Sequence, residues 1–286
     1  MSSVKIALKN VTYTYSKGTP FEIKALDDVT LDIHEGTVTG IIGHTGSGKS
    51  TMVQLFNGLT RPMAGQILLD GEDIWAKPKE IGKIRYRVGL VMQYPEYQLF
   101  EETVEADIAY GPKNMGLDEE EIRRRVADAI RFVDLDPSML SKSPFDLSGG
   151  QKRRAALAGI IAMRPEVLVL DEPAAGLDPM GRDVILNGIC HYRNETGATV
   201  IIVSHSMEDM ARFCDEIVVM DHAKVRMSGP RDSIFARSDE LLDAGLDIPE
   251  ITKMIRLLRN RGIEIDPGIY TVDRAEQELL RLFGRV

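Results

Sequence analysis

Cysteine is scarce in this chain of 286 residues, which contains only Cys190 and Cys214. The two thiols are isolated in the sequence, with neither a C-x-x-C pair nor the spacing of a set of metal ligands. A disulfide framework is therefore not expected to hold the fold together. The pattern predicts a reducing compartment and a packing role for both side chains.

Long apolar runs are missing too. The longest include AALAGIIAM, from Ala155 to Met163, which is far shorter than the roughly 18 residues that span a bilayer. The first ten residues, MSSVKIALKN, carry charges where a secretory signal needs its apolar stretch. We therefore expect the chain to stay in the cytoplasm and to act at a membrane only through partner proteins.

Positive charge is in deficit, because 35 lysines and arginines face 44 acidic residues, for a net charge of −9. Nucleic-acid phosphates attract basic surfaces, so this balance argues against nucleic acid as a general partner. The length allows one large domain, or one of about 230 residues with a small appendage. Either is long enough to bury a sizeable core.

Glycine, by contrast, is concentrated in one stretch, GHTGSGKS, which matches G-x-x-x-x-G-K-[ST] at every fixed position. It follows an apolar run and precedes the amphipathic TMVQLFNGL, as a turn between a strand and a helix does. Gly43, Gly46 and Gly48 allow backbone N–H groups to converge on a phosphate. Lys49 can meet the β and γ phosphates, and the Ser50 hydroxyl can bind Mg²⁺.

We expect the whole stretch, and the residue after it, to contact the nucleotide. His44 and Thr45 occupy variable positions of the pattern, and no individual role is expected for His44. The predicted nucleotide-binding residues of this loop are Gly43, His44, Thr45, Gly46, Ser47, Gly48, Lys49, Ser50 and Thr51.

Two kinds of strand pattern surround the loop. Alternating polar and apolar residues, in VKIALKN from Val4 and in VTLDI from Val29, predict half-solvated antiparallel strands. Continuous apolar runs predict strands that are buried on both faces of a parallel sheet with helices on each side. These runs are VTGII before the loop, VGLVM from Val88, VLVL from Val167 and TVIIVS from Thr199.

Helical periodicity dominates residues 94–164. In LDEEEIRRRVADAIRFVDL one apolar stripe contains Ile122, Val126, Ala129, Ile130 and Val133, and Asp118 with Glu121 resembles a capping box. The run from Arg123 to Arg125 is expected to lie on a solvated helix face.

Residues 231–286 lack the parallel-sheet pattern. Two amphipathic stripes predict helices, one through Ile251, Met254, Ile255 and Leu258 and one through Ala275, Leu279, Leu282 and Phe283. Between them IEI and IYTV flank a Pro267–Gly268 turn. We expect a small α+β appendage whose apolar faces pack on the main domain or on another chain.

Two carboxylates end the apolar run VLVLDE. Asp171 is suited to serve as a direct or outer ligand of Mg²⁺ beside a phosphate loop. Glu172 is placed to polarise a water toward a γ-phosphate. A third motif, LSGGQKRRAALAGIIA from Leu147, begins with a Ser-Gly-Gly turn that opens a helix and forms a second anion site.

Together with Gln93, with AGLD from Ala175 and with His205 after its strand, these motifs resemble the ATP-binding cassette (ABC) ATPases over about residues 4–230. The resemblance implies a P-loop, RecA-like α/β core with an antiparallel β subdomain and a helical insert at about 94–164. It divides the chain into a nucleotide-binding domain, 1–230, and an accessory domain, 231–286, that could serve dimerisation. It also implies an enzyme that hydrolyses ATP with Mg²⁺.

The resemblance assigns roles residue by residue. Glu172, His205 and Gln93 become catalytic, with Gln93 also joining Ser50 and Asp171 around Mg²⁺. Tyr15 matches the aromatic residue that stacks on adenine. In the family two cassettes enclose two ATP molecules head to tail, so one cassette caps the nucleotide of its partner. The residues that match this cap are Ser148, Gly149, Gly150 and Gln151, and Asp178 matches the acid that links the two sites.

The stretch QYPEYQLFEETVEADIAYGPKNMGL from Gln93 is similar to the ATPases of energy-coupling factor transporters, which import vitamins and transition-metal ions. GHTGSGKST, PFDLSGGQKRR and AGLDPMGR resemble the second of the two paralogous ATPases in the group-sharing transporters. One departure is Ala174, where relatives commonly have Thr. The resemblance implies a paralogous ATPase partner, a transmembrane coupling subunit and substrate-capturing membrane subunits, on the cytoplasmic face of the membrane.

Three other interpretations stay open at this point. A homodimeric ATPase of a dedicated cobalt or nickel uptake transporter would use the same motifs. A soluble cassette ATPase of DNA repair or translation would normally show a long coiled-coil insertion or two cassettes in one chain. A P-loop kinase would explain the loop and the carboxylates but not LSGGQ.

Overall fold

The predicted parallel strands form the centre of the molecule, a six-stranded sheet in the order β10-β9-β3-β8-β7-β6. The computed structural model describes residues 3–284. The strands are β3 (Val38–Gly43), β6 (Val88–Val91), β7 (Val167–Asp171), β8 (Thr199–Val203), β9 (Glu216–Asp221) and β10 (Lys224–Pro230). β3, β6, β7, β8 and β9 run parallel, and β10 pairs antiparallel to β9. The predicted α/β class is confirmed, although β9 and β10 were not predicted.

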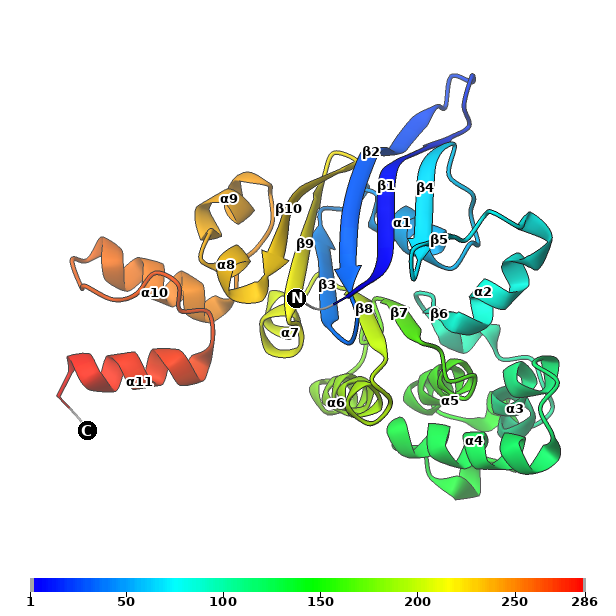
Figure 1. Ribbon diagram of the computed structural model, residues 1–286. Helices are drawn as coiled ribbons and strands as arrows, with labels where there is room; N and C mark the ends of the chain where they lie inside the picture. The colour runs from blue at the N-terminus through cyan, green and yellow to red at the C-terminus, as the bar shows by residue number, and fades with distance from the viewer. Residues whose placement is uncertain (1–2, 285–286) are drawn as a thin grey trace.

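A second, antiparallel sheet has the order β2-β1-β4-β5, so the predicted antiparallel strands are confirmed. The alternation of buried and exposed residues holds from Val29 to Ile33 but not in β1, where the residues from Lys5 to Leu8 are all buried. Its strands are β1 (Val4–Tyr15), β2 (Ile23–His34), β4 (Ala64–Leu69) and β5 (Glu72–Asp73). Figure 1 shows this sheet above the helices that cover the other side of the central sheet. Helix α1 (Lys49–Phe56) begins at the end of the phosphate loop and is buried between the sheets.

The central sheet is covered on both faces, which explains its continuous apolar sequence. Ile41 and Val169 face the core beneath the antiparallel sheet, whereas Ile42, Leu168 and Leu170 face the core on the side of the helices. Neighbouring residues on a strand point to opposite faces, so a strand between two cores needs an apolar residue at every position.

Helix α2 (Ile81–Arg87) packs Ile81 and Ile84 against the core beneath the antiparallel sheet. The helices on the second side of the central sheet and in the insert are α3 (Val104–Asn114), α4 (Glu119–Phe132), α5 (Gly149–Ile161), α6 (Pro179–Thr196) and α7 (Met207–Phe213). Short 3₁₀ turns are η1 (Pro78–Glu80), η2 (Pro95–Gln98), η3 (Pro137–Met139) and η4 (Pro144–Asp146). None of the helices between residues 3 and 284 combines the length and apolarity required to cross a bilayer.

Half of the capping box predicted for α4 forms. Asp118 accepts a hydrogen bond from the Glu121 amide at 2.9 Å, but the Glu121 carboxylate pairs with Arg125 at 2.7 Å instead of returning to the cap. Arg123 and Arg124 are exposed as expected. Arg125 is largely buried and donates to the carbonyl of Met163 at 2.9 Å, so the solvated-face prediction fails for this residue.

The C-terminal residues form α8 (Arg231–Phe235), α9 (Ser238–Asp243), α10 (Glu250–Asn260) and α11 (Val272–Leu282). The two amphipathic helices are confirmed, and α10 and α11 extend away from the two sheets (Figure 1). The β part of the expected α+β appendage is wrong, because the described residues 231–284 contain no strand. The division of the chain into functional domains at residue 230 stays a prediction.

The failed strand prediction has a physical cause. Ile265 and Ile269 are buried against Ile255 of α10 and Ala275 of α11 in a small core of their own. The next residue, Tyr270, belongs to the main core and stacks on Phe235 with ring centroids 5.2 Å apart. The segment therefore bridges two cores without forming strands. An isolated two-stranded hairpin would be only marginally stable in its place.

The close approach of α6 to the end of α4 generates a prediction. A Cβ on Gly188 of α6 would collide with the carbonyl of Phe132, whereas a Cβ on Gly82 of α2 would meet open space. We expect Gly188→Ala to destabilise the fold by about 1–3 kcal/mol through overpacking. Gly82→Ala should stabilise it by up to about 1 kcal/mol through lower entropy of the unfolded chain.

Urea unfolding followed by circular dichroism measures both changes. Equal midpoints for Gly188→Ala and the wild type would contradict the close packing of α4 on α6.

Candidate functional site

The glycine-rich loop lies between β3 and α1, as predicted. Gly48 is the N-cap of α1 and has φ of 105°, a conformation that residues with a side chain rarely adopt. A Cβ there would also collide with the carbonyl of Ala25 in β2. The sequence pattern therefore reflects a real constraint, since only glycine allows the loop to pass so close to β2.

Lys49 is buried beneath the loop. Its ammonium donates to the carbonyl of Gly43 at 2.7 Å and to that of His44 at 3.0 Å. Burial lowers the pKa of Lys49, while the charges of Glu172 and Asp171 oppose that shift. A lysine held this way is a cation inside the loop, ready to be drawn to an anion that enters.

A cavity of about 450 Å³ opens above the loop. The carboxyl ends of parallel strands meet at one edge of a sheet, and this edge supplies the catalytic candidates from β6, β7 and β8. The predicted site residues that line the cavity are Tyr15, Thr45, Gly46, Gly48, Lys49, Ser50, Thr51, Gln93, Asp171, Glu172 and His205. Gly43, His44 and Ser47 belong to the same loop but do not line the cavity.

Tyr15 lies at the end of β1 and is 39% exposed. Its hydroxyl shares a hydrogen bond of 3.0 Å with the Thr51 hydroxyl, and Tyr13 packs against its ring edge-to-face at 4.9 Å. These two contacts orient an aromatic ring at the edge of the cavity, where it can pack against a flat ligand.

The two carboxylates at the end of β7 differ in environment. Asp171 is 6% exposed, and burial raises its pKa. Burial and the neighbouring charge of Asp171 raise the pKa of Glu172 to about 7. Glu172 also has φ of 52°, which is uncommon for a residue with a side chain and is typical of functional sites. A carboxylate with a pKa near neutrality suits a general base.

His205 follows β8 and faces Glu172. Its Nε2 lies 3.5 Å from Glu172 Oε1, and that buried oxygen has no hydrogen-bond partner among the described residues. Burial and the charge of Lys49 lower the pKa of His205, so the neutral imidazole predominates at pH 7. The buried, unpaired oxygen of Glu172 is costly unless a water or substrate satisfies it.

The residues present fit Mg²⁺ together with a phosphate. Magnesium prefers oxygen ligands, and the Ser50 hydroxyl, the Gln93 amide and the Asp171 carboxylate all line the cavity. The buried hydroxyl of Ser47 in the loop also lacks a partner in the described part of the chain. Unsatisfied polar atoms around a glycine cradle are what a phosphate site needs.

The second predicted anion site lies elsewhere in the molecule. Ser148 caps α5 in a full capping box, with Gln151 Oε1 accepting from the Ser148 amide at 2.9 Å. Asp178 caps α6 and accepts from the Gly181 amide at 2.6 Å. Ser148, Gly149 and Asp178 are exposed, and none of the residues from Ser148 to Gln151 lines the cavity above the loop. Within one chain these groups do not join the phosphate loop.

A buried ion pair that the sequence analysis missed ties three of these segments together. Arg153 of α5 is 4% exposed and forms a two-pronged pair with Glu96 at 2.7 and 3.0 Å. It also donates to the carbonyl of Ala175, in the turn that follows Glu172. Partial burial opposes the ionisation of Glu96, but Arg153 holds its pKa below the ordinary value. The only sequence signals were an arginine in LSGGQKRR and an acid near Gln93.

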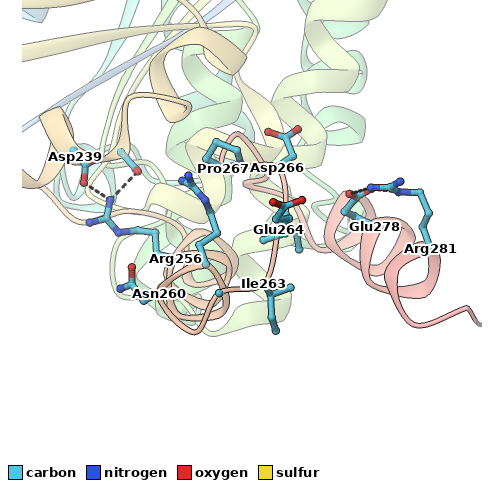
Figure 2. A pocket seen from close by; sticks show the side chains of 13 residues that line it. Asp239, Arg256, Asn260, Ile263, Glu264, Asp266, Pro267, Glu278 and Arg281 are labelled. Atoms are coloured by element: carbon cyan, nitrogen blue, oxygen red, sulfur yellow. Dashed lines mark hydrogen bonds and ion pairs between the residues drawn. The ribbon is translucent and has the colours of Figure 1, made fainter.

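A larger hollow of about 1000 Å³ lies among the C-terminal helices (Figure 2). Its arginines are largely paired, Arg256 with Asp239 and Arg281 with Glu278, as the dashed lines of Figure 2 show. These pairs are largely exposed, and the Arg281–Glu278 pair favours both charged forms, because Arg281 lowers the pKa of Glu278 and Glu278 raises the pKa of Arg281. The smaller cavity above the loop therefore carries the chemistry.

Known proteins share both the sequence and the fold. Residues 26–175, more than half of the chain, match the family described as ABC transporter. The energy-coupling factor transporter ATP-binding protein EcfA2 of Clostridium acetobutylicum is 52% identical, with 97% of each chain covered. The structure of cbiO1 from Clostridium perfringens, part of the ABC transporter complex cbiONQ, superposes with a TM-score of 0.76 at 37% identity, covering 89% of this chain and 100% of that one.

The dimeric, post-hydrolysis structure of the ATP-binding cassette MJ0796 bound to ADP and Pi has a TM-score of 0.71 at 30% identity. It covers 79% of this chain and 98% of its own.

The Arg153–Glu96 pair generates a stability prediction. Arg153→Met leaves a largely buried carboxylate without its partner, so we expect a loss of about 3 kcal/mol or more in unfolding free energy. Removing the second charge as well, in Arg153→Met with Glu96→Leu, should recover part of that loss. Chemical denaturation measures all three proteins.

Arg131→Met is the matched control, because Arg131 also forms a two-pronged pair, with Glu195, but on the exposed surface. Its cost should be about 1 kcal/mol or less. Equal losses for the two single variants, with no recovery in the double variant, would contradict the role assigned to the buried pair.

Proposed function

The chain belongs to the ABC transporter family of ATPases and, within it, to the ATP-binding proteins of energy-coupling factor transporters, and on this premise we propose that it powers the uptake of vitamins or other micronutrients. The cavity above the phosphate loop, where a carboxylate with a pKa near 7 lies beside a neutral histidine, supports ATP hydrolysis as the source of energy. The likeness to energy-coupling factor transporter proteins supports uptake as its use.

In this proposal the loop amides and Lys49 bind the phosphates of ATP, and Tyr15 stacks on the adenine. Mg²⁺ would be held by Ser50, Gln93 and Asp171 and would neutralise charge on the phosphates. Glu172 accepts a proton from water as the water oxygen bonds to the γ-phosphorus and the bond to the bridging oxygen breaks. His205 holds the water and the Glu172 carboxylate in position.

A second ATPase completes the site. Ser148, Gly149 and Gly150 are at a helix N-terminus that is free to bind an anion from another chain. Ser148 and Gly149 are exposed, and none of the three residues lines the cavity of its own chain, which supports a head-to-tail pair in which each cassette caps the ATP of the other. Gln151 follows these residues in the first turn of α5, and Asp178, the N-cap of α6, is also exposed. We propose a paralogous ATPase as the partner.

A groove between η2, α3 and α5 supports docking of the transmembrane coupling subunit. The groove has a volume of about 170 Å³ and is lined by Phe100, Tyr110 and Met163 among others. Phe100 is 59% exposed, Tyr110 is 45% exposed, and their rings pack edge-to-face with centroids 4.9 Å apart. Exposed aromatic side chains that lie together commonly mark a protein interface. In this proposal the chain is a peripheral protein on the cytoplasmic face of the membrane.

The groove is joined to the ATP cavity through the chain itself. Gln93 lines the cavity, and Glu96, three residues on, pairs with Arg153 of α5. The segment then reaches the groove at Gln98 and Phe100. Closure of the ATPase pair around ATP would thus move the groove and any membrane helix held in it, and hydrolysis would reset the pair.

A homodimeric ATPase in a dedicated cobalt or nickel transporter is the second candidate. The likeness to cbiO1, which is part of the ABC transporter complex cbiONQ, is the observation that favours this alternative. The residues of the site are the same in both cases, so only the identity of the partner chains distinguishes them.

Recovery of the complex from native membranes tests the proposal. The tagged chain, solubilised in mild detergent, should co-purify with a paralogous ATPase and a polytopic membrane protein. Phe100→Glu should lose the membrane protein and keep the ATPase, because it places a charge in the apolar groove. Phe21→Glu is the control, since Phe21 is 80% exposed on the β1–β2 turn, outside the groove.

Two copies of this chain with one membrane protein would instead identify the homodimeric transporter. Recovery with nucleic acid or ribosomes and without any membrane protein would refute a transport function.

The raised pKa of Glu172 generates a prediction on pH dependence. The carboxyl group is protonated below its pKa of about 7 and cannot accept a proton, so kcat/KM should rise with pH through about 7 and level off above it. Steady-state ATP hydrolysis by the assembled transporter, measured from pH 5.5 to pH 9 in an assay of constant ionic strength, tests this.

Glu172→Gln should lower kcat by about 100-fold or more and preserve ATP binding. It should also abolish the rise of kcat/KM with pH near 7. Because the phosphate ligands stay in place, ATP should trap the variant in a closed pair that size-exclusion chromatography detects. Turnover at the wild-type rate would refute Glu172 as the base.

A further inference from the structure

Three side chains that the ATPase mechanism does not use gather beside the phosphate loop. His44 Nε2 lies 3.2 Å from Asp221 Oδ1, and His222 Nε2 lies 3.7 Å from the same oxygen. One ligand atom from each residue falls within 4.8 Å of the others, the only such group of histidine, cysteine and acidic residues among residues 3–284. The chain has five histidines, and two of them meet here.

The hydrogen bonds of His44 determine which ring nitrogen carries its proton. Nδ1 lies 2.9 Å from the carbonyl of Thr45, and a carbonyl can only accept, so Nδ1 is the donor. In the neutral ring the Nε2 lone pair is then directed toward Asp221 Oδ1, 3.2 Å away, and both atoms can bind the same ion. Metal-binding histidines are typically oriented in this way, by a backbone carbonyl on the other nitrogen.

Asp221 is held in a fixed orientation. Its second oxygen, Oδ2, accepts from Arg226 at 2.9 Å, which leaves Oδ1 directed at the two histidines. Oδ1 is therefore the carboxylate oxygen that is available to bind an ion.

His222 can complete the group with little movement. It is at the turn between β9 and β10, and its side chain is 88% exposed. His222 has φ of 43° and the next residue, Ala223, has φ of 64°. A two-residue hairpin turn of this kind normally contains Asn or Gly. His222 therefore occupies a turn position at which Asn or Gly is usual.

We propose that His44, Asp221 and His222 bind one divalent transition-metal ion of the class of Zn²⁺, Co²⁺ or Ni²⁺. Two imidazole nitrogens and one carboxylate oxygen suit these ions, and solvent fills the open positions. Ligands of a tetrahedral ion lie about 3.3 Å apart at the usual bond lengths, close to the spacing already present between His44 and Asp221. The site differs from the Mg²⁺ position, whose donors are oxygen atoms alone.

A metal ion here would fasten the phosphate loop to the β9–β10 hairpin. His44 belongs to the loop, and its carbonyl accepts from Lys49 at 3.0 Å. The ion would therefore restrain the segment that must close around phosphate. By linkage, an ion that changes nucleotide affinity has its own affinity changed by the same factor.

Titration of the untagged full chain with Co²⁺ tests the site. Excess Mg²⁺ occupies the oxygen donors near Asp171, and nucleotide is omitted, so the result does not depend on ATP turnover. Visible absorption reports nitrogen ligation of Co²⁺, and equilibrium dialysis counts the ions. We expect one ion per chain, competed away by Zn²⁺.

His222→Asn is the decisive variant, because asparagine tolerates positive φ and lacks the imidazole. We expect Co²⁺ binding to weaken by at least about tenfold in it. His191→Gln is the control, since His191 pairs with Glu195 at 2.9 Å and belongs to no group of three possible ligands in the part of the chain that the structure describes. It should bind Co²⁺ as the wild type does. Equal binding by wild type and His222→Asn, or no stoichiometric binding by the wild type, would overturn the proposal.

Discussion

The parallel pairing of β3, β8 and β7 is the constraint on which the site depends. It places the phosphate loop after β3, the carboxylates at the end of β7 and His205 after β8 along one edge of the sheet. The register is maintained by apolar side chains on both faces, so the polar groups appear only where the strands end. The chemistry of the site therefore rests on the packing of a core that takes no part in it.

Electrostatics then differentiates the groups at that edge. Lys49, Asp171, Glu172 and His205 are all removed from water to some degree, and burial disfavours the charged form of each. Glu172 is affected strongly because Asp171 adds a like charge to its desolvation. Two neighbouring acids thus become suited to different work, one to bind a cation and one to accept a proton.

The Arg153–Glu96 pair gives the site a mechanical connection to the rest of the molecule. Arg153 belongs to the helix that Ser148 caps, Glu96 follows Gln93, and the carbonyl of Ala175 follows Glu172. A buried pair of this kind holds well-defined geometry, because separating the charges in a poorly solvated place is costly. Three motifs that are distant in the sequence are thereby held in contact, and the segment that carries Glu96 continues to the aromatic groove.

The sequence by itself determined the elements whose signal is local. The phosphate loop follows from the conformational freedom of glycine, and the buried strands and amphipathic helices follow from the periodic spacing of apolar residues. Both signals lie in residues that are close together in the sequence. The candidate residues that line the cavity above the phosphate loop were also identified from sequence motifs, although their roles stay predictions. Local signals failed at Ile265 and Ile269, where two cores compete for one segment. Only the tertiary structure decided that Arg153 meets Glu96 and that His44 meets Asp221 and His222, because contacts between residues far apart in the chain depend on how the whole core packs.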